Sequence, residues 1–405
     1  MSINDIIEIE GGITSPRGFQ AAGVHCGIKK AKKDFALVYT AAPAVCAATF
    51  TTNVVQAAPV LVDKELCARG GRFKALAVNS GNANACTGDR GMHDAWEMVR
   101  LTAEALHIHQ EEVLVSSTGV IGQYLSMEKI AAGITLSAQS LGADGTSAAE
   151  AIRTTDTFTK EAAVQFVHNG VTITLGGMAK GSGMIAPNMA TMLAFVSTDA
   201  NIGAIALQQA TQRSVGRSFN RISVDGDMST NDMVIVLANG LAGNPGIAEP
   251  TGELYALIAA ALEQLLVTLA KMIVMDGEGA TKFLEIRMLG AASEKEADQA
   301  ARAVANSNLV KTAIHGEDAN WGRILAAIGY SGITFDPALV TIQFGDVPIL
   351  GQHYAIDFSE ERAKQVLSQR EIVLTIDLHG GSASATFWTC DLSKDYVAIN
   401  ANYRT

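Results

Sequence analysis

Basic side chains are scarce in this sequence of 405 residues: 30 lysines and arginines stand against 41 aspartates and glutamates, a formal net charge of −11. A chain without a basic excess is poorly suited to nucleic acid or to an anionic membrane surface. Aromatic residues make up only 6% and charged residues 18%, whereas hydrophobic residues reach 48%. Such a composition excludes intrinsic disorder. We therefore expect a folded protein that binds neither nucleic acid nor a membrane.

Cysteine is scarce as well. The five cysteines are odd in number, lie far apart in the sequence and show no C-x-x-C spacing: Cys26, Cys46, Cys67, Cys86 and Cys390. Neither a zinc site nor a disulfide framework is therefore expected. Reduced thiols are typical of the cytosol, so the sequence predicts a cytoplasmic protein.

Targeting and membrane signals are also missing. The first residues, MSINDIIEIEGGI, contain no arginine and no basic region followed by an apolar one, so neither a secretory signal nor a transit peptide is predicted. The longest apolar stretch, residues 254–274, is interrupted by Glu263, Gln264 and Lys271. A membrane span needs about 20 mostly apolar residues. We interpret this stretch as a buried or amphipathic core helix.

What the sequence does contain is 38 glycines and an alternation of helix and strand patterns. Strands are expected near residues 113–116, 191–196, 282–288, 340–344, 372–378 and 383–390. Helices are expected near residues 94–107, after 126, over 253–274, over 293–305 and from 359. The fold class is α/β or α+β with substantial sheet.

Two local features of this pattern are sharper than the rest. Asn169 and Gly170 suit a turn that needs positive φ, so they predict a β-hairpin, which a glycine-rich loop over residues 176–190 follows. After about residue 289 the elements become more regular and more charged. This change predicts a C-terminal subdomain over residues 289–405.

Several motifs fail when their spacing is checked. Residues 225–232 place oxygen-bearing side chains at alternate positions, as in a calcium loop, but Thr230 and Val236 stand where that loop needs glycine and glutamate. The glycines of residues 176–182 end on serine, where a phosphate loop needs lysine. The eight histidines show no H-E-x-x-H pattern. The sequence supports no metal site.

Ser126 and Lys129 have the S-x-x-K spacing of penicillin-binding hydrolases, in which one helical turn brings the lysine beside the serine. Residues 311–313 resemble the K-T-G motif in part, but the S-D-N motif is absent. The simpler interpretation is that Ser126 caps the N-terminus of a helix. A hydrolase of this kind is a minor alternative.

The best candidate for chemistry is segment 177–195, GMAKGSGMIAPNMATMLAF, in which a glycine-rich loop leads to Thr191. A threonine hydroxyl needs a base, and cleavage before Thr191 would free an α-amine for that role. The pKa of an α-amine, about 7.7–8.0, suits proton transfer near neutral pH. Small Ala190 and the flexible approach permit the strain of an N-to-O acyl shift. On spacing alone, an ordinary strand threonine is the alternative.

The chain also resembles the ornithine acetyltransferase family, which is also called glutamate N-acetyltransferase, over essentially its whole length. The resemblance lies in long motifs in a fixed order: SPRGFQAAGVHCGIK at 15–29, TFTTNVVQAAPV at 49–60, AVNSGNANACTG at 77–88, SSTGVIG at 116–122, GMAKGSGMIAPNMATMLAF at 177–195, NRISVDGDMSTND at 220–232, DGEGATKF at 276–283, LVKTAIHGEDANWGRILAAIGYSG at 309–332 and INANYRT at 399–405.

This resemblance implies an activity and its reacting groups. The precursor would cleave itself between Ala190 and Thr191 into an α chain, 1–190, and a β chain, 191–405. Thr191 would take an acetyl group from N-acetylornithine and pass it to glutamate in a ping-pong reaction. Thr118 and Gly119 would form the oxyanion hole. One hydroxyl and one backbone N–H there could contribute about 3 kcal/mol or more.

The resemblance also implies the residues that bind the amino-acid substrate. They are Thr157, Lys180, Thr191, Glu278, Asn400 and Thr405. The charge of Lys180 suits the α-carboxylate, and Glu278 suits an ammonium group or a relayed proton. The last residues of the chain should therefore fold back into the site.

The implied fold is a layered αββα sandwich, in which residues 191–288 join the α chain in the main domain, with a smaller C-terminal α/β domain. The implied assembly is a heterotetramer of two α and two β chains. No cofactor or metal is implied, although acetyl-CoA could be a second acetyl donor. Met275 stands where relatives often carry arginine, which leaves fine substrate preference open. The polar segment 315–323 could bridge subunits or domains.

Two other functions are alternatives. A self-cleaving aminopeptidase or amidase of the same fold would pass the acyl group to water instead of glutamate. A binding protein for acetylated amino acids would be neither cleaved nor catalytic.

Overall fold

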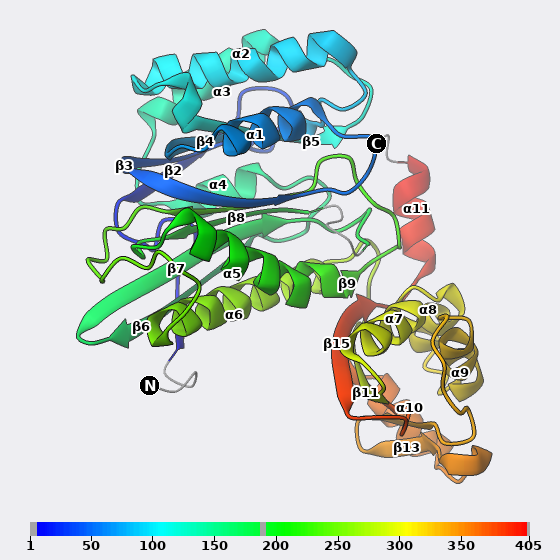
Figure 1. Ribbon diagram of the computed structural model, residues 1–405. Coiled ribbons are helices and arrows are strands. Elements are labelled where there is room, and N and C mark those ends of the chain that lie inside the picture. Colours follow the sequence, from blue (N-terminus) through cyan, green and yellow to red (C-terminus); the bar gives the residue numbers. More distant parts are fainter. Residues whose placement is uncertain (1–5, 187–191, 403–405) are drawn as a thin grey trace.

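Two β-sheets organise the protein in the computed structural model, which describes residues 6–186 and 192–402 (Figure 1). Within these residues the larger sheet has nine strands in the order β1-β6-β7-β8-β10-β3-β4-β5, with β2 paired to β3. Its strands are β1 (Ile7–Ile9), β2 (Phe19–Val24), β3 (Phe35–Phe50), β4 (Phe73–Asn82), β5 (Val113–Val120), β6 (Lys160–His168), β7 (Val171–Lys180), β8 (Leu193–Thr198) and β10 (Met233–Ala238).

The long strand β3 joins the two layers of this sheet. Its first part, residues 35–39, pairs with β2 and β4, whereas residues 45–50 pair with β10, and the register shifts between Tyr39 and Ala44. The strand therefore passes from one layer to the other, and the sheet becomes two stacked layers (Figure 1).

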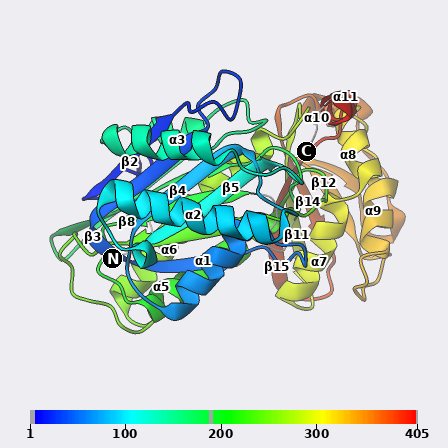
Figure 2. The ribbon, with the colours of Figure 1, turned by 90° about the horizontal axis from the view of Figure 1, so that it is seen from above.

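Helices cover both outer faces of the stack (Figures 1 and 2). The β2–β5 layer carries α1 (Ala58–Arg69), α2 (Gly88–Leu106) and α3 (Met127–Gln139), and the other layer carries α5 (Ala204–Arg217) and α6 (Glu253–Met275). The short helix α4 (Gly145–Ala151) packs mainly on β2. The predicted αββα sandwich is confirmed.

The central strands are buried on both faces, which explains their uninterrupted apolar runs. In β8, Leu193 and Phe195 pack in the core with the side chains of β3, β4 and β5. Their neighbours Ala194 and Val196 point the other way, into the core beneath α5 and α6. The apolar helix α6 belongs to this second core, as predicted. Among the described residues it is the one helix long and apolar enough to cross a membrane, and its side chains are mostly buried.

The smaller sheet has six strands in the order β13-β12-β14-β11-β15-β9. Its strands are β9 (Ile222–Ser223), β11 (Phe283–Ala291), β12 (Thr341–Phe344), β13 (Val347–Leu350), β14 (Glu371–Asp377) and β15 (Ala383–Cys390). The accompanying helices are α7 (Glu294–Ala305), α8 (Asn308–His315), α9 (Trp321–Gly329) and α10 (Glu360–Leu367). The predicted boundary at residue 289 falls inside β11, and the sheet also includes β9 from earlier in the chain.

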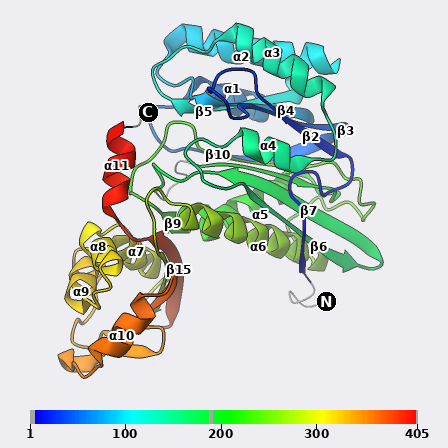
Figure 3. The same ribbon diagram turned by 180° about the vertical axis from the view of Figure 1, so that it is seen from behind.

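The final helix, α11 (Lys394–Asn402), leaves the smaller unit and lies beside the main sandwich (Figure 3). This helix lies on the same side of the sandwich as the end of β5 (Figure 1). This return positions α11 for the cavity described below.

Some of the local predictions are confirmed and others are wrong. The hairpin of β6 and β7 is confirmed, with φ of 50° at Asn169 and 79° at Gly170. Ser293 caps α7, because its side chain accepts a hydrogen bond from the N–H of Glu296. Ser126 precedes α3 but makes no side-chain cap hydrogen bond there. The predicted loop over 176–190 is wrong for its first residues, because pairing with β6 and β8 continues β7 to Lys180.

Candidate functional site

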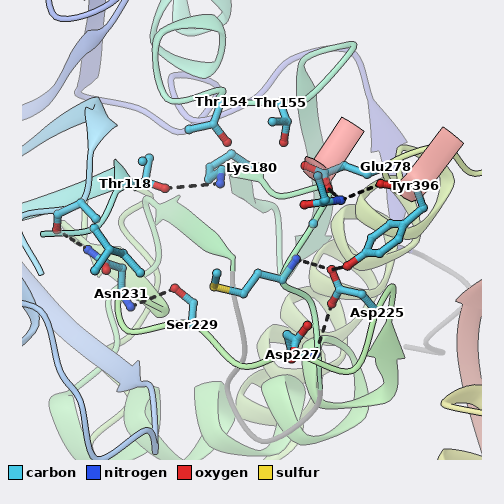
Figure 4. Close-up of a pocket in the computed structure, with 16 residues that line it drawn as sticks. Thr118, Thr154, Thr155, Lys180, Asp225, Asp227, Ser229, Asn231, Glu278 and Tyr396 are labelled. Atoms are coloured by element: carbon cyan, nitrogen blue, oxygen red, sulfur yellow. Dashed lines mark hydrogen bonds between the residues drawn. The ribbon is translucent and has the colours of Figure 1, made fainter. Parts of the chain in front are cut away.

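A cavity of about 250 Å³ lies where the ends of β5 and β7 meet the loop before β10, the loop after α6 and helix α11 (Figure 4). Five of the predicted site residues line it together: Thr118, Gly119, Lys180, Glu278 and Asn400. They come from segments that are up to 282 positions apart in the sequence. The fold therefore collects these residues at one place.

Among the described residues that were predicted for the site, Thr157 is not one of those that line the cavity. The N–H of Thr157 donates to both carboxylate oxygens of Asp276, at 3.2 and 3.0 Å, and its hydroxyl donates to the same carboxylate. Thr154 and Thr155 line the cavity in its place. Ala190, Thr191 and Thr405 lie outside the described residues.

The contact between Lys180 and Thr118 decides how the threonine hydroxyl is used. Lys180 Nζ lies 3.3 Å from Thr118 Oγ1 (Figure 4). An ammonium group can only donate, so Thr118 Oγ1 accepts this hydrogen bond. The hydroxyl hydrogen of Thr118 is then left to point elsewhere, and the open direction is the cavity. The Thr118 hydroxyl can therefore donate a hydrogen bond to a group in the cavity while it accepts one from Lys180.

Gly119 follows Thr118 in a conformation that requires glycine. Its φ is 133°, and a Cβ atom there would lie 2.3 Å from the backbone carbon of Gly81 and 2.5 Å from the nitrogen of Asn82. Neither backbone atom can move aside cheaply, because β4 and β5 are paired at this point. The glycine therefore lets the backbone end of β5 reach the cavity wall, as an oxyanion-hole N–H would require.

Among the described residues that line the cavity, one is a buried cation and several are acids. Lys180 is only 5% exposed, and burial lowers the pKa of its ammonium, although the carboxylate of Asp156 opposes this shift. On the other side, Asn400 Nδ2 donates to Glu278 Oε2 at 2.8 Å, which ties α11 to the loop after α6. A ligand in this cavity thus meets both the side chain of Lys180 and that of Glu278 (Figure 4).

Sequence reasoning missed a second acidic group, Asp225. The N–H groups of Met184 and Ile185 donate to its carboxylate at 2.5 and 2.8 Å, and Tyr396 Oη donates to it at 3.2 Å. Burial raises the pKa of Asp225. The acidic stretch was noticeable in the sequence, where its spacing resembled a calcium loop. Its actual role is to hold the loop after β7 and helix α11 together.

The hydrogen bond from Tyr396 gives a first prediction. Tyr396→Phe should raise KM for the amino-acid substrate about two- to twelvefold with little change in kcat, because it removes one of the bonds that hold α11 at the cavity, worth about 0.5–1.5 kcal/mol. The measurement is steady-state kinetics of the purified variant. Tyr330→Phe, an exposed tyrosine on the smaller unit, is the control and should leave KM unchanged. An unchanged KM in Tyr396→Phe would contradict the anchoring role.

The described chain resumes next to the cavity just after Thr191. The N–H of Met192 donates to Asp232 Oδ1 at 2.9 Å, and the neighbouring Asn231 lines the cavity. Asn231 itself is fixed, because its Nδ2 donates to the carbonyl oxygens of Ala83 and Ser117 at 2.7 and 2.8 Å. Thr191 is therefore directly bonded to a residue that is anchored at this site.

The other sequence motifs lie elsewhere or form no site. Lys129 Nζ donates to the carbonyl oxygen of Gly27 at 2.5 Å, and neither Ser126 nor Lys129 lines the cavity. All five cysteines are free thiols. Among residues 6–186 and 192–402, no group of three acidic, histidine or cysteine side chains is placed to hold a metal ion.

The fold and the cavity together define a class: a four-layer αββα protein with a polar site that suits a small zwitterionic ligand. The sequence profile of the ArgJ family matches residues 20–405. The arginine biosynthesis bifunctional protein ArgJ of Symbiobacterium thermophilum is 54% identical over 401 residues, which cover 98% of this chain and 99% of the relative. The chain therefore belongs to the ArgJ family, and it is an acyltransferase of arginine biosynthesis.

Two solved structures are also similar to parts of the chain. One is the arginine biosynthesis bifunctional protein ArgJ of Bacillus halodurans, 47% identical, with a TM-score of 0.44 over 46% of this chain and 98% of that chain. The other is an ornithine acetyltransferase of Mycobacterium tuberculosis complexed with ornithine, 40% identical, with a TM-score of 0.43 over 45% of this chain and 98% of that chain.

Proposed function

We propose that the protein transfers the acetyl group of N-acetylornithine to glutamate through an acetyl ester on Thr191. The observation that carries this proposal is the Lys180–Thr118 contact, because it leaves the hydroxyl hydrogen of Thr118 available to an oxyanion at the end of β5, where Gly119 lines the same cavity. The family resemblance supplies the nucleophile, and Met192, the next residue, is anchored beside the cavity.

The first step is activation of the precursor. The hydroxyl of Thr191 attacks the carbonyl carbon of Ala190, the peptide C–N bond breaks, and an ester forms while the nitrogen becomes a free α-amine. Water then hydrolyses the ester and releases the new carboxyl terminus of Ala190. The products are the α chain, 1–190, and the β chain, which begins with Thr191. The freed α-amine is the base that the hydroxyl lacked.

The second step is acetyl transfer. The α-amine accepts the proton of the Thr191 hydroxyl, whose oxygen attacks the acetyl carbonyl of N-acetylornithine. Thr118 and Gly119 donate hydrogen bonds to the oxyanion, and its collapse breaks the acetyl–nitrogen bond as the proton passes to the leaving amine. The amine of glutamate then attacks the ester, reversing the sequence. Both half-reactions use the same two hydrogen-bond donors, Thr118 and Gly119, which suits ping-pong kinetics.

Substrate binding follows from the charges in the cavity. Both substrates carry an α-carboxylate, which suits the ammonium of Lys180. The side chain of ornithine ends in an ammonium group, which suits Glu278 with its partner Asn400. Thr157 was predicted to bind substrate as well, but its bonds to Asp276 favour a supporting role for it. We expect Thr405 to reach the site because α11 carries Asn400 to it.

The test is the choice of acetyl acceptor. Purified protein with N-acetylornithine and glutamate should produce ornithine and N-acetylglutamate in equal amounts, with no net release of acetate. Accumulation of acetate in place of N-acetylglutamate would mean that water is the acceptor and that the protein is an amidase. A full-length, uncleaved chain that binds acetylated amino acids without turnover would instead establish the binding-protein alternative.

Two further expectations complete the proposal. We expect the mature enzyme to be a cytoplasmic heterotetramer of two α and two β chains that needs no metal or other cofactor. Acetyl-CoA as the only donor, with glutamate as acceptor, distinguishes an enzyme that can also start the pathway from one that only recycles acetyl groups. The same assay run with Met275→Arg tests whether Met275, beside the loop of Glu278, affects substrate preference.

A further inference from the structure

Behind the cavity lies a group of buried charges that the acetyl-transfer mechanism does not use. Asp156, Lys160 and Asp276, called the buried cluster below, are 1%, 0% and 5% exposed. Lys160 Nζ lies 2.7 Å from Asp156 Oδ1 and 2.5 Å from Asp276 Oδ2. Charges hidden this completely are costly unless they are paired, and here one lysine joins two carboxylates.

The buried cluster is connected to the cavity wall through the chain next to Lys180. The N–H of Gly181 donates to Asp156 Oδ1 at 2.7 Å, which fixes the end of β7 immediately after Lys180. Lys160 begins β6, the strand paired with β7, and its register partner is Ala179. Both neighbours of Lys180 are therefore fixed: Gly181 by its hydrogen bond to Asp156, and Ala179 by its pairing with Lys160.

The far side of the buried cluster is equally well fixed. The carboxylate of Asp276 accepts hydrogen bonds from the N–H of Thr157, at 3.0 Å, and from the hydroxyl of Thr157. The segment 156–160 therefore surrounds this carboxylate. Asp276 stands at the end of α6, two positions before Glu278. The cluster thus links the loop of Glu278 to the strand end of Lys180, which are the two charged sides of the cavity.

The charge balance explains why the buried cluster has this composition. Its two carboxylates and one lysine carry a formal net charge of −1, and Asp156 attracts both Lys180 and Lys29. Lys180 is only 5% exposed, so little water is available to stabilise its charge. A buried ammonium of this kind needs a fixed carboxylate nearby to remain charged.

We propose that the buried cluster positions Lys180 and keeps its ammonium charged for binding the α-carboxylate of the amino-acid substrate. The inference rests on the proposed function in one respect, namely that Lys180 binds this carboxylate. Asp156 acts through Lys180, so it is a positioning residue and does not touch the reacting atoms. Lys160 and Asp276 support Asp156 from behind.

The electrostatics of Lys180 agree with this role. Burial lowers the pKa of Lys180, and the positive charge of Lys160 lowers it further. The carboxylates of Asp156 and other acids oppose this shift. Burial alone would raise the pKa of Asp156, but Lys160, Lys180 and the N–H of Gly181 hold it below its ordinary value, so Asp156 stays ionised. The five charged groups that act on Lys180 come from four segments of the chain: Asp156 with Lys160, Asp232, Glu278 and Lys29.

These opposing influences give a test with a sign. Carboxylate binding needs protonated Lys180, so binding is present below the pKa of Lys180 and is lost as pH rises through it. Asp156→Asn removes the supporting anion and should move the alkaline limb of kcat/KM for glutamate down by about one pH unit. At pH values between the alkaline limb of the variant and that of the wild-type protein, KM for glutamate should then be about tenfold higher in the variant.

A double variant changes the charges in a different way. Lys160→Met with Asp276→Asn removes one buried charge of each sign and leaves Asp156 as the partner of Lys180. Because the repulsion from Lys160 is gone, the alkaline limb should not move down, even if the protein melts at a lower temperature. This variant adds no net buried charge, so it keeps the question answerable if Asp156→Asn does not fold.

The control is a buried carboxylate at a distance. Asp199 is 1% exposed, receives the N–H of Thr174 at 2.9 Å, and follows β8 at the end opposite Thr191. Asp199→Asn should lower the melting temperature without moving the alkaline limb. Asp156→Glu keeps the negative charge, so its alkaline limb should lie close to that of the wild-type protein.

The experiment measures kcat/KM for glutamate against pH, with N-acetylornithine as the donor, together with the melting temperature of each variant. A downward shift in Asp156→Asn alone supports the positioning role. An unmoved limb in Asp156→Asn, or a downward shift in the double variant, would overturn it. Failure of the wild-type protein to transfer acetyl at all would instead reject the proposed function, so the two failures are distinguishable.

Discussion

Thr191→Ala should yield a protein that is neither cleaved nor active. The substitution removes the hydroxyl that attacks the Ala190 carbonyl, so the precursor keeps its full length and no α-amine is released. The same hydroxyl is the acetyl acceptor, so turnover should fall below detection even if the protein folds normally. A denaturing gel and the ornithine-release assay measure the two losses on one sample.

Thr191→Ser is the matched control for this prediction. Serine keeps both the hydroxyl and, after cleavage, the α-amine, so this variant should still produce two chains and should retain measurable turnover. Two bands of about half the mass in Thr191→Ala would show that another residue drives cleavage. Turnover in the uncleaved alanine variant would show that another group carries the acetyl.

Thr118→Val should lower kcat about 100- to 1000-fold while KM changes little, because valine preserves the shape of threonine but removes one donor to the oxyanion. The loss should be large because Lys180 already occupies the hydroxyl as an acceptor, so its hydrogen is directed into the cavity. Turnover is expressed per cleaved chain, as measured on a gel, so that slower cleavage is not counted as slower transfer.

Two variants bracket the Thr118 prediction. Thr118→Ser keeps the hydroxyl and should recover most of the lost kcat. Thr211→Val removes a buried threonine hydroxyl in α5, where it donates to the carbonyl oxygen of Leu207 at 2.8 Å, and should leave kcat unchanged. A normal kcat in Thr118→Val would remove Thr118 from the oxyanion hole.

Local chemistry made part of the fold predictable. Asn169 and Gly170 required a turn with positive φ, and Ser293 offered a cap to the helix that follows it. Strand β3 gave no such signal. It is long, rich in alanine and covered on both faces, so it shows no alternation of polar and apolar residues, and its passage between the two layers depends on strands far away in the sequence.

The candidate site was predictable only where a motif carried it. Thr118, Gly119, Lys180, Glu278 and Asn400 were named from the resemblance, and the structure places them around one cavity. From periodicity alone, Lys180 belonged to a loop, whereas pairing with Leu193 makes it the last residue of β7.

The residues that sequence reasoning missed act through tertiary contacts. Asp225 receives backbone N–H groups from a loop 40 positions earlier and a hydroxyl from 171 positions later. Neither contact leaves a trace in local spacing. Thr155 and Thr157 are the same residue type two positions apart, so the sequence does not distinguish them. In the structure Thr155 contacts Ser182, whereas Thr157 donates to Asp276.

The most direct test of the proposed chemistry is the mass of the β chain after a single half-reaction. The cleaved protein is mixed with N-acetylornithine in the absence of glutamate, quenched with acid and digested for mass spectrometry. We predict that the peptide beginning with Thr191 is heavier by one acetyl group, carried on its side-chain oxygen, and that added glutamate removes it as N-acetylglutamate. A β chain that releases ornithine while Thr191 remains unacetylated would contradict the proposed acyl-enzyme.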